Sequence, residues 1–249
     1  MAYREDEDLI FLKDCPNEEL DVVFTLLTKG QDGNPRLTEE ITINDRYKAN
    51  QPDHSTYWDL IAGELQCFGG NSFATMFRGG KGVLYKELLT DACDKMKVNY
   101  NKNSSIEIIE SNLLMKILTD SIADMSPEQV RELVNELEIN TTDFSKQAVI
   151  AALQLGARLS GFMAYKIAVI VANAIAKMLL GRGLTFAAGA TLTKSMSVII
   201  GPVGWAITAA WTVMDIAGPA YRVTIPCVIQ IACLRAKRKY ALAGVQAAQ

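Results

Sequence analysis

The sequence predicts an all-α protein: an N-terminal helical domain followed by a C-terminal apolar, Gly/Ala-rich helical bundle or hairpin. Three observations predict this fold class. Apolar residues recur at three- and four-residue spacing through the first 146 residues, helix-start signals precede these stripes, and no run alternates apolar and polar residues as a half-buried strand would. With 249 residues, 49% of them hydrophobic, the chain is long enough for one large domain or two ordinary ones with a real core.

The helical elements are justified in chain order by their start and stop signals. Pro16 suits a first helical turn, the Glu18/Glu19 pair suits the positive helix end, and Lys29-Gly30 is a stop signal. The carboxylates of such pairs are interpreted as solvated. Further helices are predicted to begin near Thr56, near Leu84, at Ser104 and at Ser126, where Pro127 and Gln129 complete a capping-box pattern.

Charge divides the chain unevenly. Residues 1–146 hold 27 acidic and 15 basic residues, a net charge of −12, whereas residues 147–249 hold one acidic and 10 basic residues, a net charge of +9. We therefore predict a short N-terminal helical segment (1–50), an acidic helical domain (51–146) and an apolar, basic helical region (147–249). The basic region suits an anionic lipid surface or an acidic protein face, or it docks on the acidic half of the same chain.

The C-terminal region contains two long apolar stretches. Residues 159–180 are apolar apart from two lysines, and residues 195–214 carry no charge, which is about the length that spans a bilayer. Gly201-Pro202 interrupts the second stretch, and Gly218-Pro219 and Pro226 follow it. We predict two short helices, about 184–200 and 203–217, forming a hairpin that is a buried core element, a re-entrant insertion or an oligomer interface.

Two groups of charged residues are candidates for interaction in this region. Asp215, the only acid between residues 147 and 234, is interpreted as an ion-pair partner of Arg222 or Lys194 at the hairpin turn; the alternative is a functional acid within a membrane. The tail suits anionic headgroups, although a helix end can carry such residues for solubility alone. Its basic residues are Arg235, Lys237, Arg238 and Lys239.

The remaining motifs do not predict catalysis, a cofactor or a metal. His54 is the single histidine and lies in a helix-entry turn, and the Gly-Gly-Lys-Gly loop at residues 79–82 lacks the hydroxyl residue of a phosphate loop. The cysteines are Cys15, Cys67, Cys93, Cys227 and Cys233, which are scattered and predict free thiols in a reducing cytosol. The acidic N-terminus has no secretory signal pattern. We expect a cytoplasmic protein, peripheral to or inserted in the inner membrane, without nucleic acid as a partner.

Several segments resemble the bacterial YaaW family over nearly the whole chain. They are residues 3–12, 64–72 and 85–89, then Gly201-Pro202-Val203-Gly204-Trp205 and residues 217–226 from Ala217-Gly218-Pro219 to Pro226. Members carry a short N-terminal domain of unknown function. Their middle region is similar to the ubiquinol–cytochrome c chaperone domain, a helical module, here over residues about 57–137. The resemblance implies a helical fold and a bacterial cytoplasmic setting, and it brings no reaction or cofactor.

Together these observations favour a non-enzymatic, chaperone- or scaffold-like helical protein that binds a membrane surface or a membrane-protein client, with homo-oligomerisation through the Gly/Ala faces as a further expectation. One alternative is a pore-forming or membrane-perturbing effector that hides the hairpin around Gly201-Pro202. A second is a soluble enzyme whose site the sequence does not reveal, which a cleft gathering several carboxylates with perturbed pKa values would support.

Overall fold

The computed structural model describes residues 3–30, 33–36, 40–69, 82–184, 201–203 and 221–247, and within this part of the chain the secondary structure is helical. An isolated antiparallel bridge joins Lys29 to Pro35. The all-α prediction is therefore confirmed. The longer elements are η1 (Ile10–Asp14), α1 (Asn17–Thr28), α2 (Asp45–Asn50), η2 (His54–Tyr57), α3 (Trp58–Gly69), α5 (Tyr85–Lys95), α6 (Ile106–Ala123), α7 (Pro127–Glu136), α8 (Lys146–Leu159), α9 (Gly161–Leu180) and α11 (Tyr221–Ala247).

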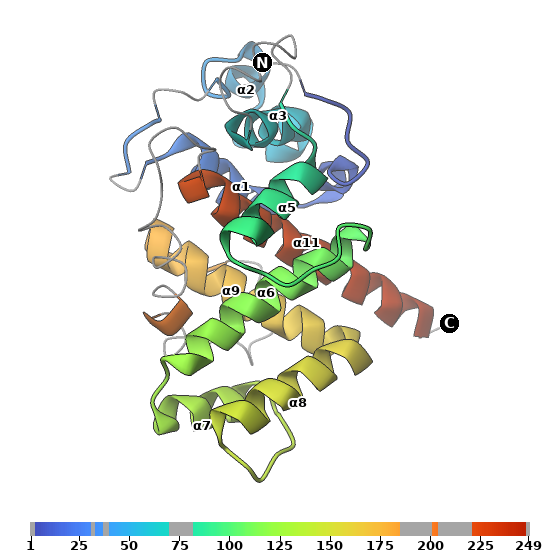
Figure 1. The fold of residues 1–249 in the computed structure, drawn as a ribbon. Coiled ribbons are helices and arrows are strands. Elements are labelled where there is room, and N and C mark those ends of the chain that lie inside the picture. Colours follow the sequence, from blue (N-terminus) through green and yellow to red (C-terminus); the bar gives the residue numbers. More distant parts are fainter. Residues whose placement is uncertain are drawn as a thin grey trace.

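The C-terminal helix α11 lies at the centre of the fold. It packs along α9 and also contacts α1, α3, α5 and α6, so it passes between helices from both ends of the sequence (Figure 1). Residues from all three predicted regions join one hydrophobic cluster, which includes Leu20, Ile61, Ile117, Val171 and Ile229. The apolar half of the chain thus contributes side chains to the same core as the acidic half.

Helix α9 is the element whose composition resembles a membrane span. It is the one helix among the described residues that is long and apolar enough to cross a bilayer, and 67% of its most apolar window is buried inside the protein. A core helix of a soluble protein has the same composition. The packing of α9 against α6, α8 and α11 accounts for its apolar character without a membrane.

The predicted hairpin lies mostly outside the described residues. Within residues 184–217, only residue 184 and residues 201–203 are described; the latter are helical, with Gly201 exposed and Pro202 and Val203 buried. Pro226, which we interpreted as a helix breaker, lies within α11 instead. The carbonyl that loses its helical partner to Pro226 belongs to Arg222, which is exposed, so water can satisfy it.

The helix starts agree with the sequence to within a residue or two. At Ser126 the complete capping box forms, as predicted. The helix expected from Thr56 begins at Trp58, after the short 3-10 turn η2, and the helix expected from Ser104 begins after Ser105. These differences are small because local side-chain capping determines where a helix starts.

Candidate functional site

The basic tail of α11 is paired with acidic residues of the N-terminal half. Arg235 contacts Glu110 of α6, Lys237 forms an ion pair with Glu19 of α1, and Arg238 reaches Asp14 of η1 at 2.8 Å. Arg235 also donates to the carbonyl of Asp8 at 2.5 Å. These contacts match the sequence alternative in which the basic half docks on the acidic half of the same chain.

Glu110 is the most deeply buried of these acids. Its two carboxylate oxygens accept from Arg235 Nε at 3.1 and 3.0 Å, and one of them also accepts from the Tyr85 hydroxyl at 2.7 Å. The Arg235 guanidinium lies over the Phe11 ring at 4.5 Å. Burial raises the pKa of Glu110 to about 7, although Arg235 and Tyr85 act in the opposite direction. This cluster fastens α11 to α5, α6 and η1.

The other predicted interaction residues are not brought together with this cluster. Lys239 and Arg222 are exposed, at opposite ends of the described part of α11. The remaining predicted residues lie outside the described residues, so the proposed pairs of Asp215 stay a prediction. They are Lys194, Trp205, Asp215, Gly218 and Pro219.

A cluster of exposed apolar side chains lies where α8, α9 and the end of α11 meet, and we call it the apolar tip. Leu159 is 78% exposed, and Leu155, one helical turn earlier, is 58% exposed. Phe162 opens α9 and its ring lies 5.0 Å from that of Tyr240 in α11, which in turn stacks on Tyr165. In Figure 1 the α8–α9 junction lies on the same side of the molecule as the C-terminal end of α11. The apolar tip consists of Leu155, Leu159, Phe162 and Tyr240.

The elements that form the apolar tip carry no acidic residue in their described parts. Arg158 lies between Leu155 and Leu159 on the same face of α8, and it is exposed. Lys166, which lies over the Phe162 ring at 4.8 Å, is buried and pairs with Glu138 at 2.5 Å. The surface around the tip is therefore apolar with an excess of positive charge.

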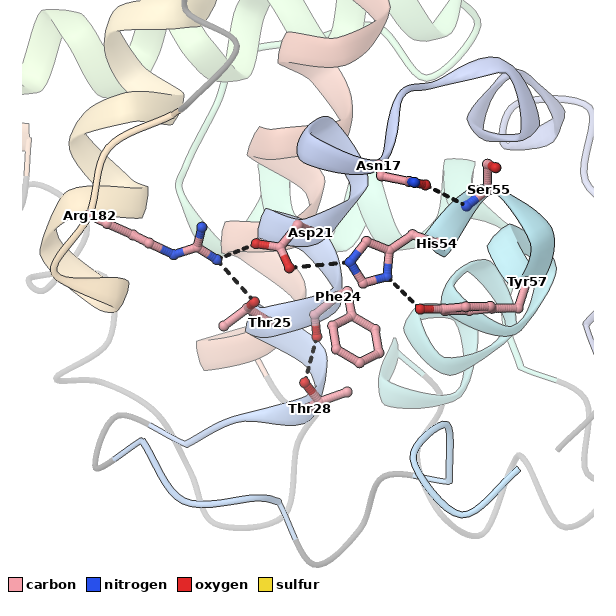
Figure 2. Close-up of polar contacts among 9 residues, drawn as sticks. All are labelled: Asn17, Asp21, Phe24, Thr25, Thr28, His54, Ser55, Tyr57 and Arg182. Carbon is pink, nitrogen blue, oxygen red and sulfur yellow. Dashed lines mark hydrogen bonds and ion pairs between the residues drawn. The ribbon is translucent and has the colours of Figure 1, made fainter. Parts of the chain in front are cut away.

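The single histidine lies in a separate polar cluster, shown in Figure 2. Tyr57 donates its hydroxyl to His54 Nδ1 at 2.8 Å, and His54 Nε2 donates to Asp21 at 3.2 Å. Asp21 also pairs with Arg182, just beyond α9. The hydrogen bond from His54 and the charge of Arg182 lower the pKa of Asp21 to about 2. Because both ring nitrogens are engaged and His54 is buried, the cluster joins α1, η2 and the end of α9 rather than offering a general base.

A cavity of about 280 Å³ beside α2 and α3 gathers several carboxylates. Arg46 donates two hydrogen bonds to Asp59, one to each carboxylate oxygen. Glu64 accepts a hydrogen bond from the backbone N–H of Glu40, and a carboxylate oxygen of Asp45 lies 3.7 Å from Lys48 Nζ. Each of these carboxylates thus has a partner within the fold. Among the described residues, no three His, Cys, Asp or Glu side chains are grouped so that they could hold a metal ion.

Sequence reasoning missed the residues of the apolar tip and the acidic partners of the tail. Glu19 was interpreted as half of a solvated pair, yet it is buried against Lys237. Leu155 and Leu159 have the spacing of a core stripe, and only the packing of α8 leaves them exposed. The sequence of α8 does contain a sign of this exposure. Arg158 lies on the same face as Leu155 and Leu159 and marks it as facing solvent, whereas the buried Val149 and Leu153 lie on another face.

Two family models match this chain. A domain of unknown function, DUF3944, matches residues 3–37, and the ubiquinol-cytochrome C chaperone family matches residues 53–230. The second match extends well beyond the resemblance seen from the sequence at about 57–137, and it includes most of the apolar region. No solved structure matches the chain.

Curated relatives are similar over almost the full length. A UPF0174 protein of Helicobacter pylori strain J99 is 49% identical over 242 residues, which cover 97% of this chain and 95% of the relative. A UPF0174 protein of Helicobacter pylori strain 26695 is 44% identical over 208 residues, 82% of this chain and 99% of the relative. The UPF0174 protein YaaW of Escherichia coli K12 is 34% identical over 238 residues, covering 94% and 95% respectively.

Proposed function

Because the chain belongs to the UPF0174 family and contains a ubiquinol–cytochrome c chaperone family domain, we propose that it is a non-enzymatic, chaperone- or scaffold-like protein that works at a membrane face. It binds the membrane surface or a membrane-protein client there through the apolar tip. The protein is cytoplasmic and attaches to the inner membrane from that side.

The observation that carries this proposal is the exposure of the apolar tip. Soluble monomers seldom expose several large apolar side chains side by side, and a patch of this kind marks a surface that another molecule covers. Here Leu159 is 78% exposed and Leu155 is 58% exposed, one turn apart on a helix that also supplies the core. The tip is therefore suited to transient burial against lipid or against the apolar surface of a client.

The ion pairs of the tail support the same proposal. By fastening α11 to α1, α6 and η1, they hold Tyr240 against Phe162 and Tyr165 at the end of the helix. A preorganised apolar surface loses less conformational entropy on binding than a flexible one. The deep packing of α9 favours attachment at the membrane face over insertion of this helix.

Fractionation of bacteria that express the whole chain tests the proposal. We expect the protein in the membrane fraction and its release by a salt wash, because the tip carries positive charge at its edge. The variant Leu159→Ser with Phe162→Ser should shift the protein to the cytosol, whereas Ile43→Ser, an exposed isoleucine beside α2, should not. A wholly cytosolic natural chain would contradict the proposal. Retention after a carbonate wash would instead favour the membrane-perturbing alternative.

A further inference from the structure

We infer that the apolar tip docks directly on a lipid bilayer that carries anionic headgroups, so that its partner is lipid rather than a protein groove or helix. This inference rests on the proposed function and identifies the partner of the same site. It follows from three properties of the tip: its shape, its charge and its aromatic edge.

The shape of the tip is a helix corner that projects from the protein. Leu159 ends α8 and Gly161 begins α9, with only Ser160 between them, and the Ser160 hydroxyl accepts from the backbone N–H of Met163 at 3.3 Å. Gly156 lies close to Met163 across the corner, so the two helix ends are packed together. Leu159 therefore projects from a short, capped turn. A projecting leucine can enter the boundary between headgroups and acyl chains, whereas a peptide client needs a groove to occupy.

The charge around the tip selects anionic rather than neutral lipid. Arg158 lies on the same face of α8 as Leu155 and Leu159, and Lys239 is exposed beside Tyr240. Neither basic side chain has an ion pair with a described residue. Acids on neighbouring segments already have partners: Glu138 pairs with Lys166, and Glu19 pairs with Lys237. The pKa of Glu107 is lowered mainly by hydrogen bonds from its own backbone N–H and from Ser105, with a smaller contribution from Lys239. Exposed Lys and Arg side chains are attracted to the negative surface potential of an anionic membrane.

The aromatic residues of the tip suit the boundary between headgroups and acyl chains. The ring of Tyr240 lies 5.0 Å from that of Phe162 and 5.4 Å from that of Tyr165, measured between centroids. Tyrosine has an apolar ring and a polar hydroxyl, and it is enriched where hydrocarbon meets headgroups. Arg158 can extend its aliphatic stem along the leucines while its guanidinium stays among the phosphates. The tip thus combines apolar, aromatic and cationic groups, which suit the acyl chains, the interface and the phosphates of an anionic membrane.

Flotation of the purified whole chain with vesicles tests this inference. Vesicles of phosphatidylcholine alone are compared with vesicles that also contain phosphatidylglycerol. We expect binding to the anionic vesicles, and weaker binding at high salt. Leu159→Ser with Phe162→Ser should weaken that binding at least ~10-fold, because it removes two large apolar side chains whose burial in the bilayer drives docking. Compared with the natural chain, Arg158→Gln with Lys239→Gln should weaken binding to the anionic vesicles by a salt-dependent factor of roughly 30.

Matched variants far from the tip serve as controls, with circular dichroism to show that each variant is folded. Ile43→Ser removes an exposed apolar side chain and Lys48→Gln removes an exposed lysine, both near α2, and neither should change flotation. Equal flotation of the tip variants and the natural chain would overturn the tip as the docking site. Failure of the natural chain to float, with membrane attachment intact in cells, would overturn lipid as the partner while leaving the proposed function with a protein client. Failure in both assays would overturn both.

Discussion

Arg235 of α11 donates from Nε to both carboxylate oxygens of Glu110, 125 positions earlier in the chain, at 3.1 and 3.0 Å. The side chain of Glu110 is 4% exposed and that of Arg235 is 15% exposed. Two charges so far from water compensate each other only while both are present. The pair therefore makes the attachment of α11 depend on single residues of α6 and α11.

Replacing Arg235 with Met should strongly destabilise the fold. The change leaves Glu110 buried without its cation, and breaking a buried ion pair in this way typically costs about 3–5 kcal/mol. Urea unfolding at pH 8 measures the loss. Lys239→Met, an exposed change on the same helix, should stay within about 0.5 kcal/mol of the natural chain. Adding Glu110→Gln to Arg235→Met should recover part of the stability, and no recovery would contradict the proposed coupling.

Glu110 should also make the stability of the protein fall as the pH rises. Its pKa is raised from 4.5 to about 7, so between these values the folded protein keeps a proton that the unfolded chain releases. The contribution is present below pH 4.5 and lost as the pH rises to about 7. Glu110→Gln removes this titration. The difference in unfolding free energy between the variant and the natural chain should therefore shift in favour of the variant from pH 5 to pH 8; a constant difference would show that Glu110 does not titrate there.

Local features of the fold could be predicted from the sequence, and long-range ones could not. The capping box of Ser126 and Gln129 spans four residues, so the sequence contains all of it. The partner of Arg235 depends on how α11 crosses α6, and many acids of the N-terminal half were equally available. Pro226 was interpreted as a breaker because proline disrupts a helix interior; its place in the second turn of α11 depends on where the helix begins.

The candidate site shows the same division. Leu155 and Leu159 have helical spacing, and a sequence pattern alone does not say whether a tertiary neighbour covers them. Their exposure follows from the turn at Ser160, which directs α9 into the core while the last turns of α8 remain at the surface. The charge asymmetry, by contrast, was readable from the sequence, and it agrees both with the pairing of the tail and with the excess of positive charge around the apolar tip.

Asp21 should make the fold sensitive to strong acid. Its pKa is lowered from 3.8 to about 2, first by the hydrogen bond from His54 and then by Arg182 (Figure 2). A lowered carboxylate pKa contributes stability that is present above pH 3.8 and lost as the pH falls to about 2. Asp21→Asn should flatten this part of the stability profile measured by circular dichroism. Asp45→Asn, at a fully exposed carboxylate, should not change how the unfolding free energy falls between pH 4 and pH 2. An equal effect of both variants would contradict the role of Asp21.

Gly82 should tolerate no side chain, because the chain that enters α5 passes directly against the end of α3. A Cβ at position 82 would lie 2.2 Å from the carbonyl carbon of Gln66 and 2.6 Å from the backbone nitrogen of Cys67. The next residue, Val83, donates its N–H to the Gln66 carbonyl at 3.0 Å, so backbone rather than a movable side chain would have to shift. Gly82→Ala should therefore cost about 1–3 kcal/mol in urea unfolding.

The matched control for that substitution is Gly161→Ala. Position 161 is the first residue of α9, where an added Cβ meets nothing within 4 Å. Alanine exceeds glycine in helix propensity by up to about 1 kcal/mol, so this variant should be as stable as the natural chain or slightly more stable. Because the two substitutions are chemically identical, a large loss at position 82 alone would locate the cost in the close approach of the two backbones. Equal effects at both positions would show that the α3–α5 junction can relax around a methyl group.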